Sequence, residues 1–200
     1  MILVAYAKAD GKVKDLDFSV RQAFPNANNK RFIDGITARK NEESVSNSLT
    51  ALVLLARLAG KMGAELDKLI LCREENGRPF FENSSLDFSI THSHNVVAVA
   101  LSDQGRVGID VEASDMSLER AGRLAERYLS EKEASSLSSV EDFLRIWTER
   151  EAYVKQSGAP LTDALKNGIE CDVEICHFEI LGYPASICFV GEQKIEIITL

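Results

Sequence analysis

The chain has 200 residues, 45% of them apolar, which is enough to bury one full hydrophobic core. Its 31 acidic and 23 basic side chains leave a formal net charge of −8. This charge argues against a nucleic-acid binder, although a local basic patch is compatible with an acidic total. The longest apolar windows are too short to cross a bilayer, and the N-terminus lacks the features of a signal peptide. We therefore expect a cytoplasmic protein with no nucleic-acid and no membrane partner.

Hydrophobic periodicity predicts strands at both ends and in the middle of the chain, with helices between them. In chain order the predicted elements are a strand at 1–7, a helix from Ser44 or Ser46 to Gly60, a short apolar run at 69–72, strands at 86–91, 96–101 and 106–112, helices at 116–128, from Ser130 and at 140–156, and strands at 173–181, 185–190 and 194–199. Residues 10–42 are polar and carry only a predicted turn at 25–29. The three middle strands should form one meander. Strands and helices in separate blocks indicate an α+β fold rather than a doubly wound sheet.

The four cysteines, Cys72, Cys171, Cys176 and Cys188, show no CxxC spacing and do not pair with histidines at zinc-finger intervals. Free cysteine behaves as a small hydrophobe. We therefore expect reduced thiols packed in the core, and no zinc site.

Two carboxylates lie close together near the end of the third middle strand. Asp110 and Glu112 are separated by a single residue, so their side chains should point to the same side. Such a pair is repulsive unless a cation or a proton lies between the two groups. The pair suits Mg²⁺, which prefers carboxylate oxygens together with water and substrate phosphate. The alternative is an ordinary solvated strand end.

The helix at 140–156 extends an apolar stripe with charged residues. Glu151 and Lys155 continue the stripe that Leu144 and Trp147 begin, whereas Glu149 should face elsewhere. Charges on such a stripe are costly unless they are paired or bind a ligand. The alternative is a routine Glu–Lys pair one turn apart, worth about 0.2–0.5 kcal/mol.

Hydrogen-bond donors cluster at a strand end and on the turn before it. The sequence T-H-S-H at 91–94 could place His92 and His94 on one face for a metal, but no third ligand is evident. Hydroxyls beside a histidine also suit a phosphate. Arg78, on a turn, offers a guanidinium to the same kind of group, although an arginine on a turn is usually only solvated.

The order and spacing of these motifs resemble the 4′-phosphopantetheinyl transferases, in particular the Sfp-type branch. That family has a [VI]-G-[VI]-D-x-E strand followed about forty residues later by a W-x-x-[KR]-E-[AS]-x-x-K helix. This chain has V-G-I-D-V-E at 107–112 and W-T-E-R-E-A-Y-V-K at 147–155. G-R-P at 77–79 and T-H-S at 91–93 match two further elements, and R-Y-L-S-E-K-E at 127–133 resembles the family's F-[ST]-x-x-E helix start. The close resemblance extends over about 77–160.

The resemblance implies two similar α+β halves with pseudo-twofold symmetry, here 1–104 and 105–200, in a monomeric protein. The residues that it assigns are Asp110, Glu112 and Glu151 as Mg²⁺ ligands, Lys155 as the group that neutralises a phosphate oxygen, and Arg78, Thr91 and His92 as contacts of the adenosine 3′-phosphate end of coenzyme A. Glu133 is expected to cap a helix rather than to act in catalysis. Where the family often has a basic residue on the first long helix, this chain has Ser46, with Arg39, Lys40 and Lys30 as nearby substitutes.

The implied activity is that of a holo-[acyl-carrier-protein] synthase. A serine hydroxyl of an apo acyl or peptidyl carrier protein would attack the β-phosphate of coenzyme A, and 3′,5′-ADP would leave. Glu151 and a metal-bound water are the candidates for the base that takes the serine proton.

The carrier partner that the resemblance implies is normally acidic, and a basic face on this chain would complement it. Arg120, Arg123 and Arg127 recur at helical spacing and resemble the family's carrier-docking surface. The alternative is a solvated face over a core-packed helix. Two other functions stay open: a Mg²⁺-dependent pyrophosphohydrolase with water as the nucleophile, and a non-catalytic coenzyme A or carrier-protein binding module.

Overall fold

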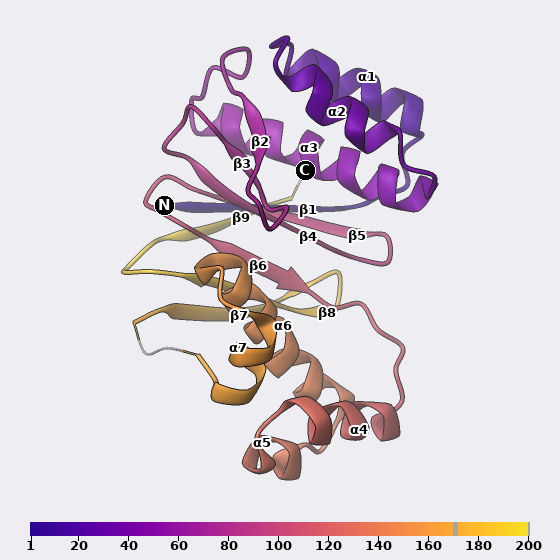
Figure 1. Ribbon diagram of the computed structural model, residues 1–200, viewed down its shortest axis with the longest axis vertical. Coiled ribbons are helices and arrows are strands. Elements are labelled where there is room, and N and C mark those ends of the chain that lie inside the picture. The colour runs from indigo at the N-terminus through magenta and orange to yellow at the C-terminus, as the bar shows by residue number, and fades with distance from the viewer. Residues whose placement is uncertain (170–171, 200) are drawn as a thin grey trace.

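A computed structural model describes residues 1–169 and 172–199 of the chain. The fold is α+β, as predicted, with two sheets stacked in the middle and helices on the outer face of each (Figure 1). The elements in chain order are β1 (Ile2–Lys8), α1 (Val13–Ala23), α2 (Asn29–Thr37), α3 (Glu42–Lys61), β2 (Leu71–Arg73), β3 (Pro79–Phe81), β4 (Asp87–Ser93), β5 (Val96–Ser102), β6 (Gly108–Val111), α4 (Leu118–Tyr128), α5 (Glu131–Ser136), α6 (Val140–Ser157), α7 (Leu161–Asn167), β7 (Glu174–Ile180), β8 (Tyr183–Phe189) and β9 (Ile195–Thr199).

The first sheet has the strand order β4-β5-β1-β9, and α1, α2 and α3 lie over its outer face. Alternate residues of β1 serve the two faces, because successive side chains of a strand point to opposite sides. Leu3 and Ala5 join the core under the helices, whereas Ile2 and Val4 join the core between the sheets. β5 is buried along its whole length because it lies in the middle of this stack.

The second sheet has the order β6-β8-β7, and α6 packs on its outer face. α6 comes unusually close to β6, and Gly108 makes this approach possible. A Cβ atom at Gly108 would lie 1.9 Å from the carbonyl oxygen of Ala152 and 2.6 Å from the amide nitrogen of Gln156. The glycine of the V-G-I-D motif therefore brings the helix that carries Glu151 and Lys155 against the strand that carries Asp110.

One order of elements occurs twice in the chain. β1, α3, β4 and β5 form a strand–helix–strand–strand series whose last strand lies in the middle of its sheet. β6, α6, β7 and β8 repeat that series with the same antiparallel pairing. β9 then returns to the first sheet and pairs parallel with β1. β9 comes after the second series in the chain but belongs to the sheet of the first series. The division into halves at residue 104 stays a prediction.

Two sequence expectations were wrong. The middle strands do not form a meander, because β4 and β5 form a hairpin while β6 crosses to the other sheet and pairs with β8. The apolar side chains of β6 are buried between the sheets, so the short turn before it changes sheet rather than making another hairpin. The polar stretch 10–42 contains α1 and α2, which were not predicted. Their buried positions, Val20, Ile33 and Ile36 among them, are too sparse to give a strong periodic signal.

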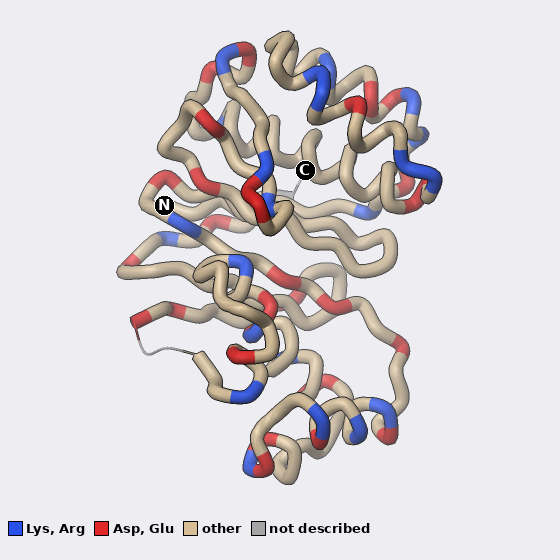
Figure 2. Tube along the Cα trace, viewed as in Figure 1, with Lys and Arg blue, Asp and Glu red and all other residues tan. Residues whose placement is uncertain are grey.

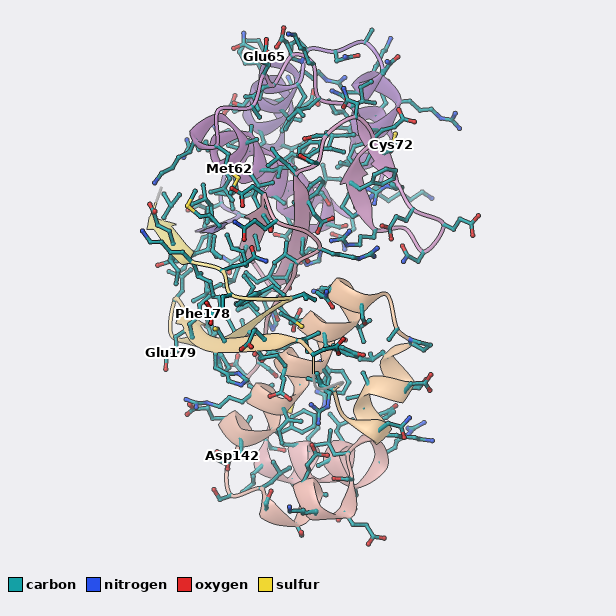
Figure 3. The ribbon with its side chains drawn as sticks, turned by 90° about the vertical axis from the view of Figure 1, so that its left-hand side faces the viewer. Met62, Glu65, Cys72, Asp142, Phe178 and Glu179 are labelled. Atoms are coloured by element: carbon teal, nitrogen blue, oxygen red, sulfur yellow. The ribbon has the colours of Figure 1, made fainter. Side chains whose placement is uncertain are left out.

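The cysteines differ in burial. Cys188 is buried, as expected, and burial raises the pKa of its thiol to about 12. Cys72, in the first body (Figure 3), is half-buried, and Cys176 is exposed, so the core expectation was wrong for Cys176. Cys171 lies outside the described residues. Among the described helices, none combines the length and apolar character needed to cross a membrane.

Candidate active site between the two halves

A row of polar side chains on β4 joins the first sheet to β6. The Thr91 hydroxyl donates to Asp110 Oδ1 at 2.8 Å, and the Ser93 hydroxyl donates to Glu112 Oε2 at 2.9 Å. The backbone amide of Ile109, on β6, donates to the side-chain oxygen Oγ of Ser89 at 3.2 Å. Since alternate residues of a strand share a side, β4 contacts both carboxylates at once. The prediction that Asp110 and Glu112 point to the same side is confirmed.

α6 reaches the same point from the other side. Lys155 Nζ lies 2.7 Å from Asp110 Oδ1 and donates to the carbonyl oxygen of Ile109 at 3.2 Å. The side chain of Asp110 is only 7% exposed, and its second oxygen, Oδ2, is buried without a hydrogen-bond partner. A buried carboxylate oxygen without a partner is costly, so this atom is suited to receive a cation or a donor.

Glu112 and Glu151 belong to the same electrostatic cluster. Burial raises the pKa of Glu151, and the charges of Asp110 and Glu112 raise it further, against an opposing effect of Lys155. Burial and the charge of Asp110 likewise raise the pKa of Glu112, while the Ser93 hydrogen bond and Lys155 lower it. In this arrangement of the described residues, no group of three or more histidine, cysteine or acidic side chains converges closely enough to hold a metal. Lys155 is the counter-ion that offsets the repulsion.

The two histidines of the T-H-S-H sequence are separated by the end of the strand. His94 occupies the β4–β5 turn with φ 51°, and its carbonyl oxygen accepts a hydrogen bond from Asn47 Nδ2 at 2.8 Å. His92 keeps an exposed edge, yet partial burial and the charges of Lys155 and Arg39 lower the pKa of its imidazole. Glu43 and Asp110 act in the opposite direction, so His92 lies among charged neighbours of both signs.

Arg78 is buried in a bidentate ion pair. Its guanidinium donates to Asp87 Oδ1 at 2.9 Å and Oδ2 at 2.7 Å, and to the carbonyl oxygens of Phe88 and Val107. The side chain is 10% exposed, which excludes the alternative of a merely solvated arginine, and the expected contact of Arg78 with coenzyme A stays a prediction. Arg78 thus holds β4 against the residue that precedes β6, while its Nε is buried without a partner.

A cavity of about 460 Å³ opens beside Lys155 at the junction of the halves. Arg78 and Pro79 line one wall, and Arg106, Lys155 and residues 158–160 line the other. A second cavity of about 540 Å³ lies between α2 and β2 and is lined by Arg31, Phe32, Arg39 and Arg73, among others. Burial and the charge of Arg39 lower the pKa of Arg73, whose guanidinium lies 4.6 Å from the centre of the Phe32 ring. The second cavity presents positive charge to a ligand, whereas in the first cavity Arg78 pairs with Asp87, Arg106 with Glu74 and Lys155 with Asp110.

Ser46, on the first long helix, points away from these cavities. It is buried, and its hydroxyl lies 3.5 Å from the carbonyl oxygens of Ala9 and Gly11. Arg39 instead contacts the hydroxyls of Ser44 and Ser48 on the same helix and projects toward the second cavity. Among the substitutes considered for Ser46, Arg39 is therefore in position to contribute charge.

The helix α4 carries the predicted basic face. Arg120, Arg123 and Arg127 are all exposed, and acidic residues lie beside them along the helix (Figure 2). Arg123 pairs with Glu119, and the Arg127 guanidinium lies 5.1 Å from the centre of the Tyr128 ring. α4 is thus amphipathic, as predicted, with its arginines available to solvent.

Glu133 completes a capping box at the start of α5. Ser130 Oγ accepts the Glu133 backbone amide, and the Glu133 carboxylate accepts the Ser130 amide. The same carboxylate pairs with Arg150 of α6 at 2.6 Å. Its predicted capping role is confirmed.

Two polar residues of β4, Asp87 and Ser89, were not assigned any role from the sequence, and Ser93 was expected only as one hydroxyl of a donor cluster for a phosphate. A signal for them was present, because Asp87, Ser89, Thr91 and Ser93 alternate at the period of a strand. Their partners, at 107, 109, 110 and 112, follow in the same direction along the chain. This alternation, placed next to the D-x-E pair, predicts a polar seam.

Fold and site together define an α+β protein with an acid–lysine cluster and an adjoining cavity at the junction of two topologically similar halves. Residues 106–188 match the sequence model of the 4'-phosphopantetheinyl transferase superfamily. The relation to this superfamily, predicted from the motifs, is thereby confirmed, and the match covers both the β6 and the α6 motif.

Individual relatives agree with this result. The 4'-phosphopantetheinyl transferase HetI of Nostoc sp. is 32% identical over 120 residues, which are 53% of this chain and 48% of the relative. AcpT of Escherichia coli K12 is 31% identical over 125 residues, 57% of this chain and 63% of the relative. The transferase gsp of Aneurinibacillus migulanus is 31% identical over 99 residues, 46% and 39% respectively. The chain spans less than two thirds of the length of these relatives.

Proposed function

We propose that this protein transfers the 4′-phosphopantetheine group from coenzyme A to a serine of an apo acyl or peptidyl carrier protein. The observation that carries the proposal is the meeting of the two matching motifs. Asp110 of β6 and Lys155 of α6 are 2.7 Å apart, with Glu112 and Glu151 in the same cluster. The named transferases that match over this region support the same reaction.

Magnesium fits the acidic cluster. Asp110 has a buried oxygen without a partner, and the pKa values of Glu112 and Glu151 are raised first by burial and then by repulsion from their acidic neighbours, both of which a divalent cation would offset. Asp110, Glu112 and Glu151 would hold the ion once their carboxylates turn toward it, because in the described structure no three such side chains converge on one point. When bound, it would neutralise charge on the pyrophosphate of coenzyme A.

Coenzyme A would occupy the cavity beside Lys155, and the cavity between α2 and β2 is a further source of positive charge. The cavity beside Lys155 places Arg78 and Arg106 within reach of a nucleotide, and Lys155 itself lies between that cavity and Asp110. His92 and Arg39 offer a second set of donors and positive charge for the 3′-phosphate.

The chain's own residues then support an in-line displacement. The serine oxygen of the carrier forms a bond to the β-phosphorus, and the bond from that phosphorus to the bridging oxygen breaks, so that 3′,5′-ADP leaves with the bridging oxygen. Lys155 stabilises the negative charge that develops on the phosphate oxygens. The candidates for the base that takes the serine proton are Glu151 and a water next to the acidic cluster.

The carrier would dock on the exposed arginines of α4. Arg120, Arg123 and Arg127 supply positive charge on a chain whose net charge is −8. Such local complementarity raises the rate of encounter with an acidic partner. A cytoplasmic location and a monomeric state complete the proposal.

The decisive experiment measures the intact mass of an apo carrier protein after incubation with this protein, coenzyme A and Mg²⁺. We expect a gain of about 340 Da, the mass of one phosphopantetheine group, which Glu151→Gln abolishes. Glu149→Gln is the matched control, because Glu149 is in the same helix but contacts Arg150 and His177 instead of the acidic cluster.

Other outcomes would favour the alternatives. Free phosphopantetheine without modified carrier would indicate a pyrophosphohydrolase with water as nucleophile. Coenzyme A binding without any turnover, on several types of carrier, would indicate a binding module and would contradict the transferase.

A further inference from the structure

We propose that Thr148, Ser186 and His177 are positioning residues that clamp α6 to the second sheet and so hold Glu151 and Lys155 in place. The inference rests on the proposed function, since it assigns these side chains to the support of that site. None of the three was given a role from the sequence.

The clamp begins in a row of side chains across the second sheet. Strand pairing places Ser186 of β8 directly opposite Asp110 of β6 on one side and His177 of β7 on the other. Residues directly opposite each other in antiparallel strands point to the same face. Since Asp110 contacts Lys155 of α6, the side chains of Ser186 and His177 also face α6. The row therefore runs under α6 from the acidic cluster to the edge strand of the sheet.

A buried pair of hydroxyls joins this row to α6. Thr148 Oγ1 lies 2.9 Å from Ser186 Oγ, and both residues are fully buried. Around them, α6 meets the sheet through small and apolar side chains. A buried hydroxyl without a partner is costly, so this pair favours one rotation of α6 on β8. Thr148 precedes Glu151 by about one turn and Lys155 by about two, so the same rotation determines where these two side chains point.

His177 extends the pair into a chain of hydrogen bonds that ends at Glu149. His177 Nδ1 lies 3.1 Å from Ser186 Oγ, and Nε2 lies 3.3 Å from Glu149 Oε2. A hydroxyl has one hydrogen to donate, and a neutral imidazole has one N–H. If Thr148 donates to Ser186, the Ser186 hydrogen is available for His177 Nδ1. The ring hydrogen then lies on Nε2 and donates to Glu149, so each contact has one hydrogen.

The opposite order leaves the last contact without a hydrogen. Thr148 would donate to the carbonyl oxygen of Arg145 at 3.1 Å and accept from Ser186. His177 Nδ1 would then donate to Ser186, and a neutral ring has no hydrogen left for Glu149. We therefore expect the first order, with the Nε2–H tautomer of His177.

A hydroxyl, an imidazole and a carboxylate in this order also form the nucleophile triads of hydrolases. Ser186 is fully buried under α6 and bonds to Thr148, so a substrate cannot reach its hydroxyl. The carboxylate at the end of the chain is itself held, because Glu149 pairs with the buried Arg150. Arg150 in turn pairs with Glu133 of the α5 cap at 2.6 Å. The chain therefore supports α6 and does not attack a substrate.

The first test measures kcat and the KM for coenzyme A with an apo carrier protein. Thr148→Val keeps the shape of the side chain and removes the hydroxyl, whereas Thr148→Ser keeps the hydroxyl. Ser186→Ala removes the partner and keeps the test available if Thr148→Val fails to fold. The matched control is Thr50→Val, because Thr50 is buried in α3 and its hydroxyl has no partner among the described residues.

We expect kcat to fall by about tenfold or more in Thr148→Val and Ser186→Ala, because a small displacement of reacting groups costs rate. The KM should change by about threefold or less, and Thr148→Ser and Thr50→Val should behave like the wild-type protein.

A second test needs no turnover. Nitrogen NMR at about pH 9, where imidazole is neutral, identifies the tautomer of His177, and His177→Gln assigns its signal. We expect the Nε2–H form in the wild-type protein and a mixture of both forms in Ser186→Ala. Hydrogen exchange of the α6 amides should become faster in Thr148→Val but not in Thr50→Val.

An unchanged kcat in folded Thr148→Val and Ser186→Ala would overturn the inference, as would a loss of kcat that Thr148→Ser does not restore. So would an Nδ1–H tautomer of His177 in the wild-type protein. A wild-type protein that binds coenzyme A but modifies no carrier would refute the proposed function alone. The tautomer and the hydrogen exchange of α6 would then still decide whether the clamp exists.

Discussion

The two halves share one order of elements but use their long helix differently. In α3, twelve of 20 residues are buried, and nearly all of them are apolar or small. In α6, seven of 18 are buried, and these include Arg150 and Gln156. The first half therefore supplies a conventional hydrophobic core, whereas the second brings charged side chains close to β6. A duplicated topology can thus divide stability and chemistry between its copies.

The largest effect should come from the close approach that only the second half uses. Gly108→Ala places a Cβ against the backbone of α6 at 1.9 Å, so the helix must move away from β6. We expect a loss of stability of more than about 4 kcal/mol, measured by chemical unfolding, or failure to fold. Gly122→Ala is the control, because no atom lies within 4 Å of its added Cβ and alanine is favoured in a helix by about 1 kcal/mol. Equal stability of the two variants would contradict the packing of α6 on β6.

A truncation in the first half should cost less and leave the chemistry intact. Leu55→Ala removes a fully buried side chain of α3 and should destabilise the protein by about 2–5 kcal/mol. Urea unfolding gives the stability, and the Kd of coenzyme A and Mn²⁺ should stay within about twofold of the wild-type values. A large loss of Mn²⁺ affinity in the folded variant would show that the first half does more than support the site.

The sequence predicted those features best that depend on the residues of a single helix or strand. The capping box at Ser130 and the amphipathic α4 follow from local spacing, and the structure contains both. The meander was wrong because nothing local to β6 tells whether it continues one sheet or begins another. Similarly, the donors around Asp110 come from β4 and α6, which are distant in sequence. Only the order of the motifs indicated that Lys155 of α6 lies near Asp110. The contacts of the β4 side chains with β6 could not be predicted, because they depend on how the two sheets pack against each other.

A charge removed from the acidic cluster should stabilise the protein while it abolishes transfer. Glu151 is buried beside Asp110 and Glu112, and both conditions disfavour its ionised form. Glu151→Gln should therefore raise the Tm by a few degrees without divalent cations and should remove the further rise that Mg²⁺ gives the wild-type protein. Differential scanning calorimetry measures both. Glu149→Gln weakens a pair with the buried Arg150 and should lower the Tm instead. A lower Tm for Glu151→Gln would mean that the carboxylate is stabilising.

The smallest expected effect on stability concerns the N-terminal caps of the two long helices, α3 and α6. The cap of α3 is the neutral Asn41, whose Oδ1 accepts the Ser44 amide at 2.9 Å. In α6 the carboxylate of Asp142 accepts hydrogen bonds from Ser138 and Ser139, which lower its pKa from 3.8 to about 2. Asp142 lies at the far end of the second body, away from the first (Figure 3).

Because the pKa of Asp142 is lower in the folded state, its contribution is present at pH values above 3.8 and is lost as the pH falls toward 2. The stability difference between the wild-type protein and Asp142→Asn should therefore shrink between about pH 6 and about pH 3 in urea unfolding. Asn41→Ala should cost about 1 kcal/mol at either pH, because an amide does not titrate. If both differences changed alike with pH, the effect would belong to the whole protein rather than to the carboxylate cap of α6.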